Sequence, residues 1–416
     1  MNWRCTARFA FCGATGLAFS AGEPIGIIAS IAFPAVALNA NSRREAYAAA
    51  AWYYGGASWP IIFAVRNFFG PEAGMCDGIL LWLAAVLLLS LPCLALWTNR
   101  REQLVWRAPL GVLLSVMPPL GLIGWASPMS AAGYLFPGTS WIGLLAVMVA
   151  IGSMASSPRI GLPVIASVAA VANILYGGAA MQVPWAGINT HFGGISHERT
   201  GALTELNAVE AIQQQALSSA ARVVVFPEAV VSNWGVATDS FWSGSLTELC
   251  KAGKTIIVGS KIETPSSAGQ FAPADFAASV AILQARSSVS PTVIAPLPPA
   301  SFRNVLIVRG TDTGVFEQQV PVPFGMWKPL NNHGVPLRFA GSGVLSVAGE
   351  RAAVLICYEQ LLIWPVLTSM LSRPTVLVAV ANDYWAGGTT IPNAQMAAVR
   401  AWARLNSIPY VSATNF

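Results

Sequence analysis

Polar residues that could do chemistry follow apolar runs at three places in the second half of the chain. Glu228 comes directly after residues 223–227, Cys357 after residues 353–356, and Asn382-Asp383 after a third run. Such apolar runs are typical of strands that are buried in a parallel sheet. Open α/β sheets bind ligands at the carboxyl ends of their strands, so these residues are candidates for a functional site.

Cys357 lies at a predicted junction of strand, sharp turn and helix, because Tyr358-Glu359-Gln360 follows it. A thiol at a helix N-terminus faces backbone N–H groups and a partial positive charge, which lower its pKa and can bind an oxyanion. Taken alone, a buried cysteine is more often inert than reactive. Three strand ends that carry Glu, Cys and Asn-Asp in this order favour a site.

Residues 183–416 predict the α/β domain that would position these side chains. Short β-rich runs alternate with helical segments there, which favours a mixed or parallel sheet covered by helices. We expect helices at 203–221, 246–252 and 391–405. We expect strands at 183–192, 222–226, 255–259, 277–284, 305–308, 375–380 and 410–413, and a pair of strands around Gly349 at 344–356.

Residues 1–182 predict a membrane domain. The chain of 416 residues is 55% hydrophobic and 10% charged, with a mean hydropathy of +0.58, whereas soluble proteins carry about 25% charged residues. All of its lysines lie beyond residue 250. Apolar runs near the ~20 residues that a bilayer demands predict six or seven spans. They lie at 9–39, as a hairpin of two short spans, and at 46–65, 78–97, 109–126, 135–155 and 160–181.

The arginines predict the orientation of these spans. If residues 9–39 form a hairpin, Arg66 falls on one side of the membrane and the other arginines of this half fall on the opposite side. The positive-inside rule then predicts a multi-pass protein of the bacterial inner membrane, with a cytoplasmic N-terminus and a periplasmic C-terminal domain. The arginines of the inner side are Arg4, Arg8, Arg43, Arg44, Arg100, Arg101, Arg107 and Arg159.

Several classes of ligand are not expected. The six cysteines contain no CxxC pair and no disulfide framework, and three histidines build no HExxH motif or Cys/His cluster, so we expect neither a metal site nor a cofactor. The net charge of +5 comes from scattered arginines rather than a basic patch, so nucleic acid is not an expected partner. Membrane lipids are expected partners, because of the predicted spans.

A series of short motifs resembles the nitrilase (carbon–nitrogen hydrolase) superfamily. Together with the predicted spans, it is similar to the apolipoprotein N-acyltransferase branch, and within that branch to conjugal transfer proteins of Agrobacterium and Rhizobium plasmids. The set is specific, although each motif is weak alone. The motifs are Phe226-Pro227-Glu228, Pro323-Phe324-Gly325, Cys357-Tyr358-Glu359, Asn382-Asp383-Tyr384-Trp385, Gln395-Met396 with Arg400-Ala401, and Ala413-Thr414-Asn415.

The resemblance implies an α-helical transmembrane bundle followed by an α/β nitrilase-like αββα sandwich domain with a Glu-Lys-Cys triad. Glu228 would be the general base, Cys357 the nucleophile that forms a thioester, and Glu359 the family's second acidic residue. The family continues beyond the motif at 413–415 with further strands and a last transmembrane helix. We expect this chain, which ends at Phe416, to lack them.

The lysine of the triad has no counterpart at its expected position. In the family it lies a few residues before Pro-Phe-Gly, where this chain has Gln318, and the acidic residue that follows Pro-Phe-Gly is replaced by Met326. Lys328 is the first candidate to replace the lysine and Lys261 the second, although either is more often a surface residue. Loss of one oxyanion donor costs ~10²–10³ in rate.

Two functions from different classes therefore remain open. The first is a thiol-dependent N-acyltransferase or amidase at the outer face of the inner membrane, acting in conjugative plasmid transfer, with lipids and a lipoprotein as partners. The second is a catalytically degenerate nitrilase-fold component that supports assembly or efficiency of the conjugation apparatus through contacts with its proteins. Glu228, Cys357 and Glu359 favour the first, and Gln318 with Met326 favours the second.

Overall fold

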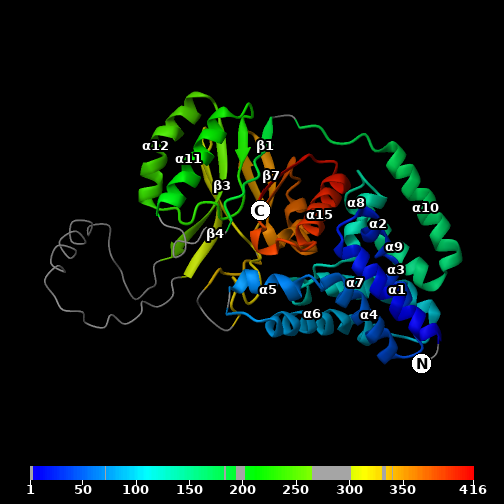
Figure 1. The fold of residues 1–416 in the computed structure, drawn as a ribbon. Helices are drawn as coiled ribbons and strands as arrows, with labels where there is room; N and C mark the ends of the chain where they lie inside the picture. The colour runs from blue at the N-terminus through cyan, green and yellow to red at the C-terminus, as the bar shows by residue number, and fades with distance from the viewer. Residues whose placement is uncertain are drawn as a thin grey trace, which may run out of the picture.

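The computed structural model describes residues 3–70, 72–181, 184–193, 202–264, 301–329, 334–339 and 341–416. A helical region comes first and is followed by two β-sheets with helices on their outer faces (Figure 1). The strand predicted at 277–284 lies outside the described residues.

The helical region breaks where the sequence predicts it, at residues 22–24, so that residues 9–39 form more than one helix. Among the described residues, α6 and α10 are long and apolar enough to cross a membrane, with mean hydropathies of 2.6 and 1.6. The larger number of spans stays a prediction. The helices are α1 (Trp3–Ser20), α2 (Pro24–Ala29), α3 (Ala32–Leu38), α4 (Arg43–Ser58), α5 (Ile61–Phe69), α6 (Met75–Leu96), α7 (Leu104–Val116), α8 (Ala132–Leu135), α9 (Trp141–Ser156) and α10 (Pro158–Leu175).

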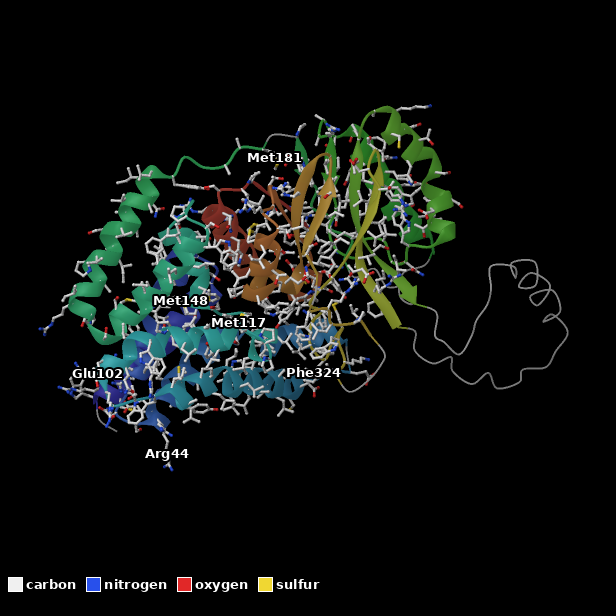
Figure 2. All side chains as sticks on the ribbon, turned by 180° about the vertical axis from the view of Figure 1, so that it is seen from behind. Arg44, Glu102, Met117, Met148, Met181 and Phe324 are labelled. Atoms are coloured by element: carbon white, nitrogen blue, oxygen red, sulfur yellow. The ribbon has the colours of Figure 1, made fainter. Side chains whose placement is uncertain are left out.

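Several connections of the helical region meet at one of its ends. Arg8 Nη2 donates to the carbonyl of Asn39 at 3.0 Å, and Asn39 Nδ2 donates to the carbonyl of Ala155 at 2.9 Å. The N-terminal helix is thereby tied to the connections α3–α4 and α9–α10. Figure 2 shows Arg44 and Glu102 on this side of the molecule, away from the sheets. The predicted inner arginines therefore gather at the end of the bundle that lies opposite the α/β part.

Two sheets form the α/β part. The first has the order β1-β2-β3-β4-β5, with β1, β2 and β3 parallel, and the second has the order β6-β7-β8-β9, with β7, β8 and β9 parallel. The mixed sheet that the sequence predicts is thus present twice. The strands are β1 (Trp185–Gly187), β2 (Val223–Val225), β3 (Thr255–Thr264), β4 (Ser301–Gly310), β5 (Gly314–Glu317), β6 (Val344–Val347), β7 (Glu350–Ile356), β8 (Val376–Asn382) and β9 (Tyr410–Asn415).

Alternate residues of each strand point to opposite faces, and both faces are buried. Val225 of β2 and Ile356 of β7 pack in one core between the two sheets. Val224 packs under α11 (Ala202–Ser218) and α12 (Val236–Lys251), whereas Leu355 shares a core with the helical region. The α/β part therefore has the four predicted layers of helix, sheet, sheet and helix, and the helical region covers its last layer (Figure 1).

That last layer consists of α14 (Ile363–Leu371) and α15 (Ile391–Asn406). The hydroxyl of Tyr134 donates to the carbonyl of Ala397 at 2.8 Å, which joins α8 to α15. Helices α8 and α15 also approach each other closely where Gly133 faces Ala401. A Cβ at Gly133 would lie 1.8 Å from the Ala401 carbonyl oxygen. The junction of the two parts therefore depends on a residue without a side chain at this position.

Some element boundaries differ from the sequence prediction. Helix α12 begins at Val236, ten residues before the predicted start, because burial of Trp242 and Leu249 outweighs the weak helix propensity of its Ser, Thr and Gly residues. Strand β5 and helix α14 were not predicted. The first has only four residues, too few to show a period, and the second directly follows the Cys357 motif, to which the sequence assigns a helix start.

We expect Gly133→Val to weaken the junction between α8 and α15. A side chain at this position has no room, and overpacking of this kind costs about 1–3 kcal/mol. Thermal unfolding of the detergent-purified protein should show a lower Tm. Gly177→Val is the matched control, because a Cβ there meets nothing within 4 Å. Equal Tm values for the two variants would contradict the close packing.

Candidate active site

Glu228 is fixed at the carboxyl end of β2 by a close approach between its backbone and β3. The N–H of Gly259 donates to the carbonyl of Pro227 at 3.1 Å. A Cβ at Gly259 would lie 2.3 Å from that oxygen and 2.5 Å from Glu228 Cα, so only glycine allows this approach. The Glu228 carboxyl group lies buried between the sheets, with 5% of the residue exposed.

Three groups hold the Glu228 carboxyl group. Asn304 Nδ2 donates to Oε1 at 2.6 Å, the backbone N–H of Asn382 donates to Oε2 at 3.1 Å, and the thiol of Cys357 is hydrogen-bonded to the same carboxyl group. Burial nevertheless raises the pKa of Glu228 above its ordinary value, against the opposing effects of these hydrogen bonds and of the Lys261 charge. The side chain is therefore a poorly solvated acid beside a thiol.

Cys357 ends β7 in a strained backbone conformation. Its φ is +50°, in the left-handed region that non-glycine residues rarely adopt and that often marks a functional turn. The residue is 3% exposed and begins a 3-10 helix of five residues, Cys357–Leu361, and α14 starts only at Ile363. The predicted helix start at the thiol is therefore present, as a 3-10 helix, whereas the predicted lowering of the thiol pKa is wrong. Burial, followed by the negative charges of Glu228 and Asp383, raises the pKa of Cys357 well above its ordinary value.

Glu359 connects the turn at Cys357 to the loop after β5. Its Oε1 accepts from the backbone N–H groups of Gln319 and Val320 at 2.6 and 2.8 Å, and its Oε2 accepts from Ile356 N–H at 2.8 Å. Burial raises the pKa of Glu359 to about 7, while the hydrogen bonds oppose that shift. Glu359 thus holds two backbone segments of the site together.

Gln318 is buried in the middle of the site. Its Oε1 accepts from Asn304 Nδ2 at 2.9 Å, and its Nε2 donates to the carbonyl of Ile356 at 3.2 Å. The side-chain amide of Asn304 therefore lies between Glu228 and Gln318. Gln318 in turn donates to the carbonyl of Ile356, the residue before Cys357. Two uncharged side chains, Asn304 and Gln318, thus occupy the region where the resemblance to the nitrilase superfamily implies a lysine.

The two candidate lysines lie outside these hydrogen bonds. The Nζ of Lys261 lies 5.1 Å from the centroid of the Phe302 ring, and Lys328 is exposed on the loop after Pro323-Phe324-Gly325. Within the described residues, neither ammonium donates a hydrogen bond to Glu228 or Cys357. The structure thus brings Glu228, Cys357 and Glu359 together, and of the two lysines only Lys261 acts on Glu228, through its charge.

Asp383 and Gln395 complete the surroundings of the thiol. Gln395 Nε2 lies 4.0 Å from Cys357 Sγ and is also hydrogen-bonded to Asp383. Burial, followed by the charge of Glu228, raises the pKa of Asp383 to about 7. Asn304 is the residue of the site that sequence reasoning missed. The sequence signal was weak: a polar residue stands directly before the apolar run at 305–308.

A cavity of about 200 Å³ lies between the helical region and the segments that carry this site. Helices α1, α4, α5 and α6 form one wall, and the loop after β5, the Cys357 turn and α15 form the other. Figure 2 shows Phe324 where that loop meets the helices. Nearly all of the lining is apolar, and Gln395 is one of its few polar residues. Lining residues include Phe19, Ala64, Phe68, Leu88, Trp125 and Trp385.

Among the described residues, no three His, Cys, Asp or Glu side chains come together as a possible metal site.

No model of a protein family matches the chain. It is 30% identical to the "Probable conjugal transfer protein TraB" of Sinorhizobium fredii over 398 residues, 93% of this chain and 92% of that protein. It is 29% identical to the conjugal transfer protein TraB of Agrobacterium fabrum over 439 aligned positions, 100% of this chain and 93% of that protein.

Solved structures are similar to part of the chain. An amidase from Nesterenkonia sp. superimposes with a TM-score of 0.30 and 12% identity, over 57% of this chain and 77% of the amidase. A variant of an amidase of the nitrilase superfamily from Nesterenkonia superimposes with a TM-score of 0.31 and 11% identity, over 56% and 78% of the two chains.

We expect the stability of the protein to fall between about pH 4 and about pH 7, because of Glu359 and Asp383. Each has a pKa of about 7 when folded and about 4 when unfolded. The folded state binds these protons more tightly, so the stabilisation is complete below about pH 4 and is lost as the pH rises through about 7.

The Tm of the purified protein, measured across this range, tests that expectation. Asp383→Asn should make the decline of Tm with pH shallower, since the amide cannot titrate. Glu248→Gln, at an exposed position of α12, should leave the decline unchanged. A decline of the same steepness in Asp383→Asn would show that the Asp383 carboxyl group does not cause it.

Proposed function

The chain belongs to the TraB family of conjugal transfer proteins, and from this premise we propose that it is a membrane-bound thiol acyltransferase acting in conjugative transfer. Cys357 would take an acyl group from a membrane lipid and pass it to an amine. The apolar cavity is the observation that carries the proposal. It lies against the helices, its lining is almost entirely apolar, and it is lined by Gln395, whose Nε2 lies 4.0 Å from the Cys357 sulfur.

In the first step, Glu228 takes the thiol proton of Cys357 while Sγ attacks the carbonyl carbon of the lipid ester. The hydrogen bond between the two side chains supplies the path for that proton. The ester C–O bond then breaks, and the departing oxygen takes the proton from Glu228. The products are a thioester on Cys357 and a lysolipid.

In the second step, the amine attacks the thioester carbonyl carbon and gives one N–H proton to Glu228. The C–S bond breaks and the thiolate recovers that proton, so the enzyme returns to its starting state. Both steps pass through an oxyanion that needs donors. Gln395 Nε2, 4.0 Å from Sγ, is placed to be one of them.

We further propose that the chain is a multi-pass protein of the inner membrane, with the α/β part in the periplasm. The outward faces of α6 and α10 are apolar, with Leu80, Ile160 and Ile174 among their exposed residues. The arginine-rich connections lie at the end of the bundle opposite the sheets, as the positive-inside rule requires for this orientation. A lipid acyl chain would then reach the cavity from the outer leaflet.

A second function is favoured by one observation, the neutral pair of Asn304 and Gln318 in place of a cation. Without a charged donor, the fold would serve as a structural component that supports assembly of the conjugation apparatus. Conjugation-apparatus proteins would then be its partners, and Cys357 would never carry an acyl group.

The acyl group itself separates the two functions. We expect the protein, during a long incubation in phospholipid nanodiscs without an amine, to gain slowly the mass of an acyl chain on the Cys357 peptide, and hydroxylamine to remove it. Glu228→Gln should slow this acylation by about 10²–10⁴, because it removes the general base. Glu210→Gln, at an exposed position of α11, is the matched control. An adduct absent from Cys357, or equally present on the exposed Cys250, would favour the structural component.

The orientation has its own test. A reporter that is active only in the periplasm should work when it is fused after residue 182 and fail when it is fused near Arg101. This follows from the arginine bias of the connections. The reverse pattern would place the α/β part in the cytoplasm and would remove an outer-leaflet lipid as the acyl donor.

A further inference from the structure

The site contains buried acceptor atoms that lack donors. Asn304 Oδ1, Asp383 Oδ1 and Gln395 Oε1 have no hydrogen-bond partner, and each of these residues is at most 3% exposed. Buried polar atoms almost always have a partner. The three side chains surround Glu228 and Cys357. Asn304 donates to Glu228, and Gln395 contacts both Cys357 and Asp383. These acceptors are therefore available to a donor that the residues of the cluster do not supply themselves.

The charge of the site points to the same kind of group. Glu228, Asp383 and Cys357 are all acids, and each is close enough to another to disturb its ionisation. Lys261, the nearest cation that acts on Glu228, lies against the Phe302 ring. The hydrogen bonds inside the cluster come from neutral amides and backbone N–H groups. A group that brings both N–H donors and a positive charge would satisfy the acceptors and balance the acids.

We propose that this cluster binds a primary ammonium group, which the acyl acceptor supplies and which takes the part of the missing triad lysine. An alkylammonium has three N–H donors and one positive charge, so it can donate to unpartnered acceptors of the cluster and offset its excess of acids. The proposal rests on the acyltransferase function and adds an order to it. The acceptor binds first, and its charge favours the ionised forms of Glu228 and Cys357.

This order has a chemical consequence. While the acceptor is absent, the thiol stays protonated, and Cys357 reacts slowly with the lipid ester. Once the acceptor is bound, a thioester forms beside the amine that will consume it. The ammonium becomes a nucleophile when it passes one proton to Glu228, after the departing lipid oxygen has taken the earlier proton. Little thioester is then exposed to hydrolysis.

Alkylation of Cys357 by iodoacetamide at neutral pH measures the activation without any acyl transfer. The probe cation is methylammonium, compared with tetramethylammonium and potassium at equal ionic strength. We expect methylammonium alone to accelerate alkylation of Cys357 with saturation, by about tenfold or more, because a nearby opposite charge shifts such an ionisation by about 1–3 pKa units. Alkylation of the exposed Cys250 in the same sample should not change. Equal acceleration by tetramethylammonium or potassium, or none by methylammonium, would overturn the proposal.

Two variants sharpen the test. Gln318→Lys should raise alkylation of Cys357 without any added cation and abolish the response to methylammonium, since the chain then carries its own ammonium. Asp383→Asn should raise the methylammonium concentration needed for half-maximal effect. The Asp383→Asn variant keeps the proposal testable if Gln318→Lys does not fold. An unchanged methylammonium response in Asp383→Asn, or in a folded Gln318→Lys, would overturn the proposal.

The outcomes also distinguish this inference from the function on which it rests. If lipid acylates Cys357 but methylammonium has no effect on alkylation, the acyltransferase stands and the ammonium site falls. If methylammonium activates the thiol but no lipid acylates it, the ammonium site stands and the acyl donor has been misassigned.

Discussion

The hydrogen bond between the buried carboxyl group of Glu228 and the thiol of Cys357 is the interaction on which the rest of the site depends. Two negative charges about 4 Å apart repel each other by about 4 kcal/mol at the effective dielectric constant near 20 that suits protein sites. The pair therefore cannot carry two charges without a cation beside it. The structure surrounds it instead with neutral amides, of which Asn304 and Gln318 are the nearest. A nucleophile built in this way is held in place but kept protonated.

The scaffold brings this pair together from two sheets. Glu228 follows a strand of the first sheet, Cys357 and Asn382 follow strands of the second, and the core between the sheets fixes their separation. Gly259 allows the backbone at Glu228 to lie against β3, and Glu359 ties the loop that carries Gln318 to the Cys357 turn. The helical region adds the apolar cavity, which neither part could form alone. Positioning of the thiol and access for a lipid thus come from different parts of the chain.

Much of this arrangement was predictable from the sequence, and the remainder depends on burial and long-range contacts. Apolar runs that end in Glu228, Cys357 and Asn382-Asp383 predicted strand ends correctly, because strand burial and turn chemistry are local properties. The direction of the Cys357 pKa was predicted wrongly, since it depends on how much protein covers the thiol and on two acids far away in the sequence. The role of Asn304 was missed because it depends on the residues beside it on other segments, Glu228 and Gln318. The contact between Gln395 and the cavity requires knowledge of how α15 packs on the helices.

The central claim is that an ammonium group bound at the site favours the ionised forms of Glu228 and Cys357. Infrared difference spectroscopy of the wild type against Glu228→Gln, recorded at neutral pH with and without methylammonium, tests it directly. The account predicts that methylammonium strengthens a carboxylate band that is absent from Glu228→Gln, at the expense of a protonated carboxyl C=O band. Identical Glu228 bands with and without methylammonium would contradict the account.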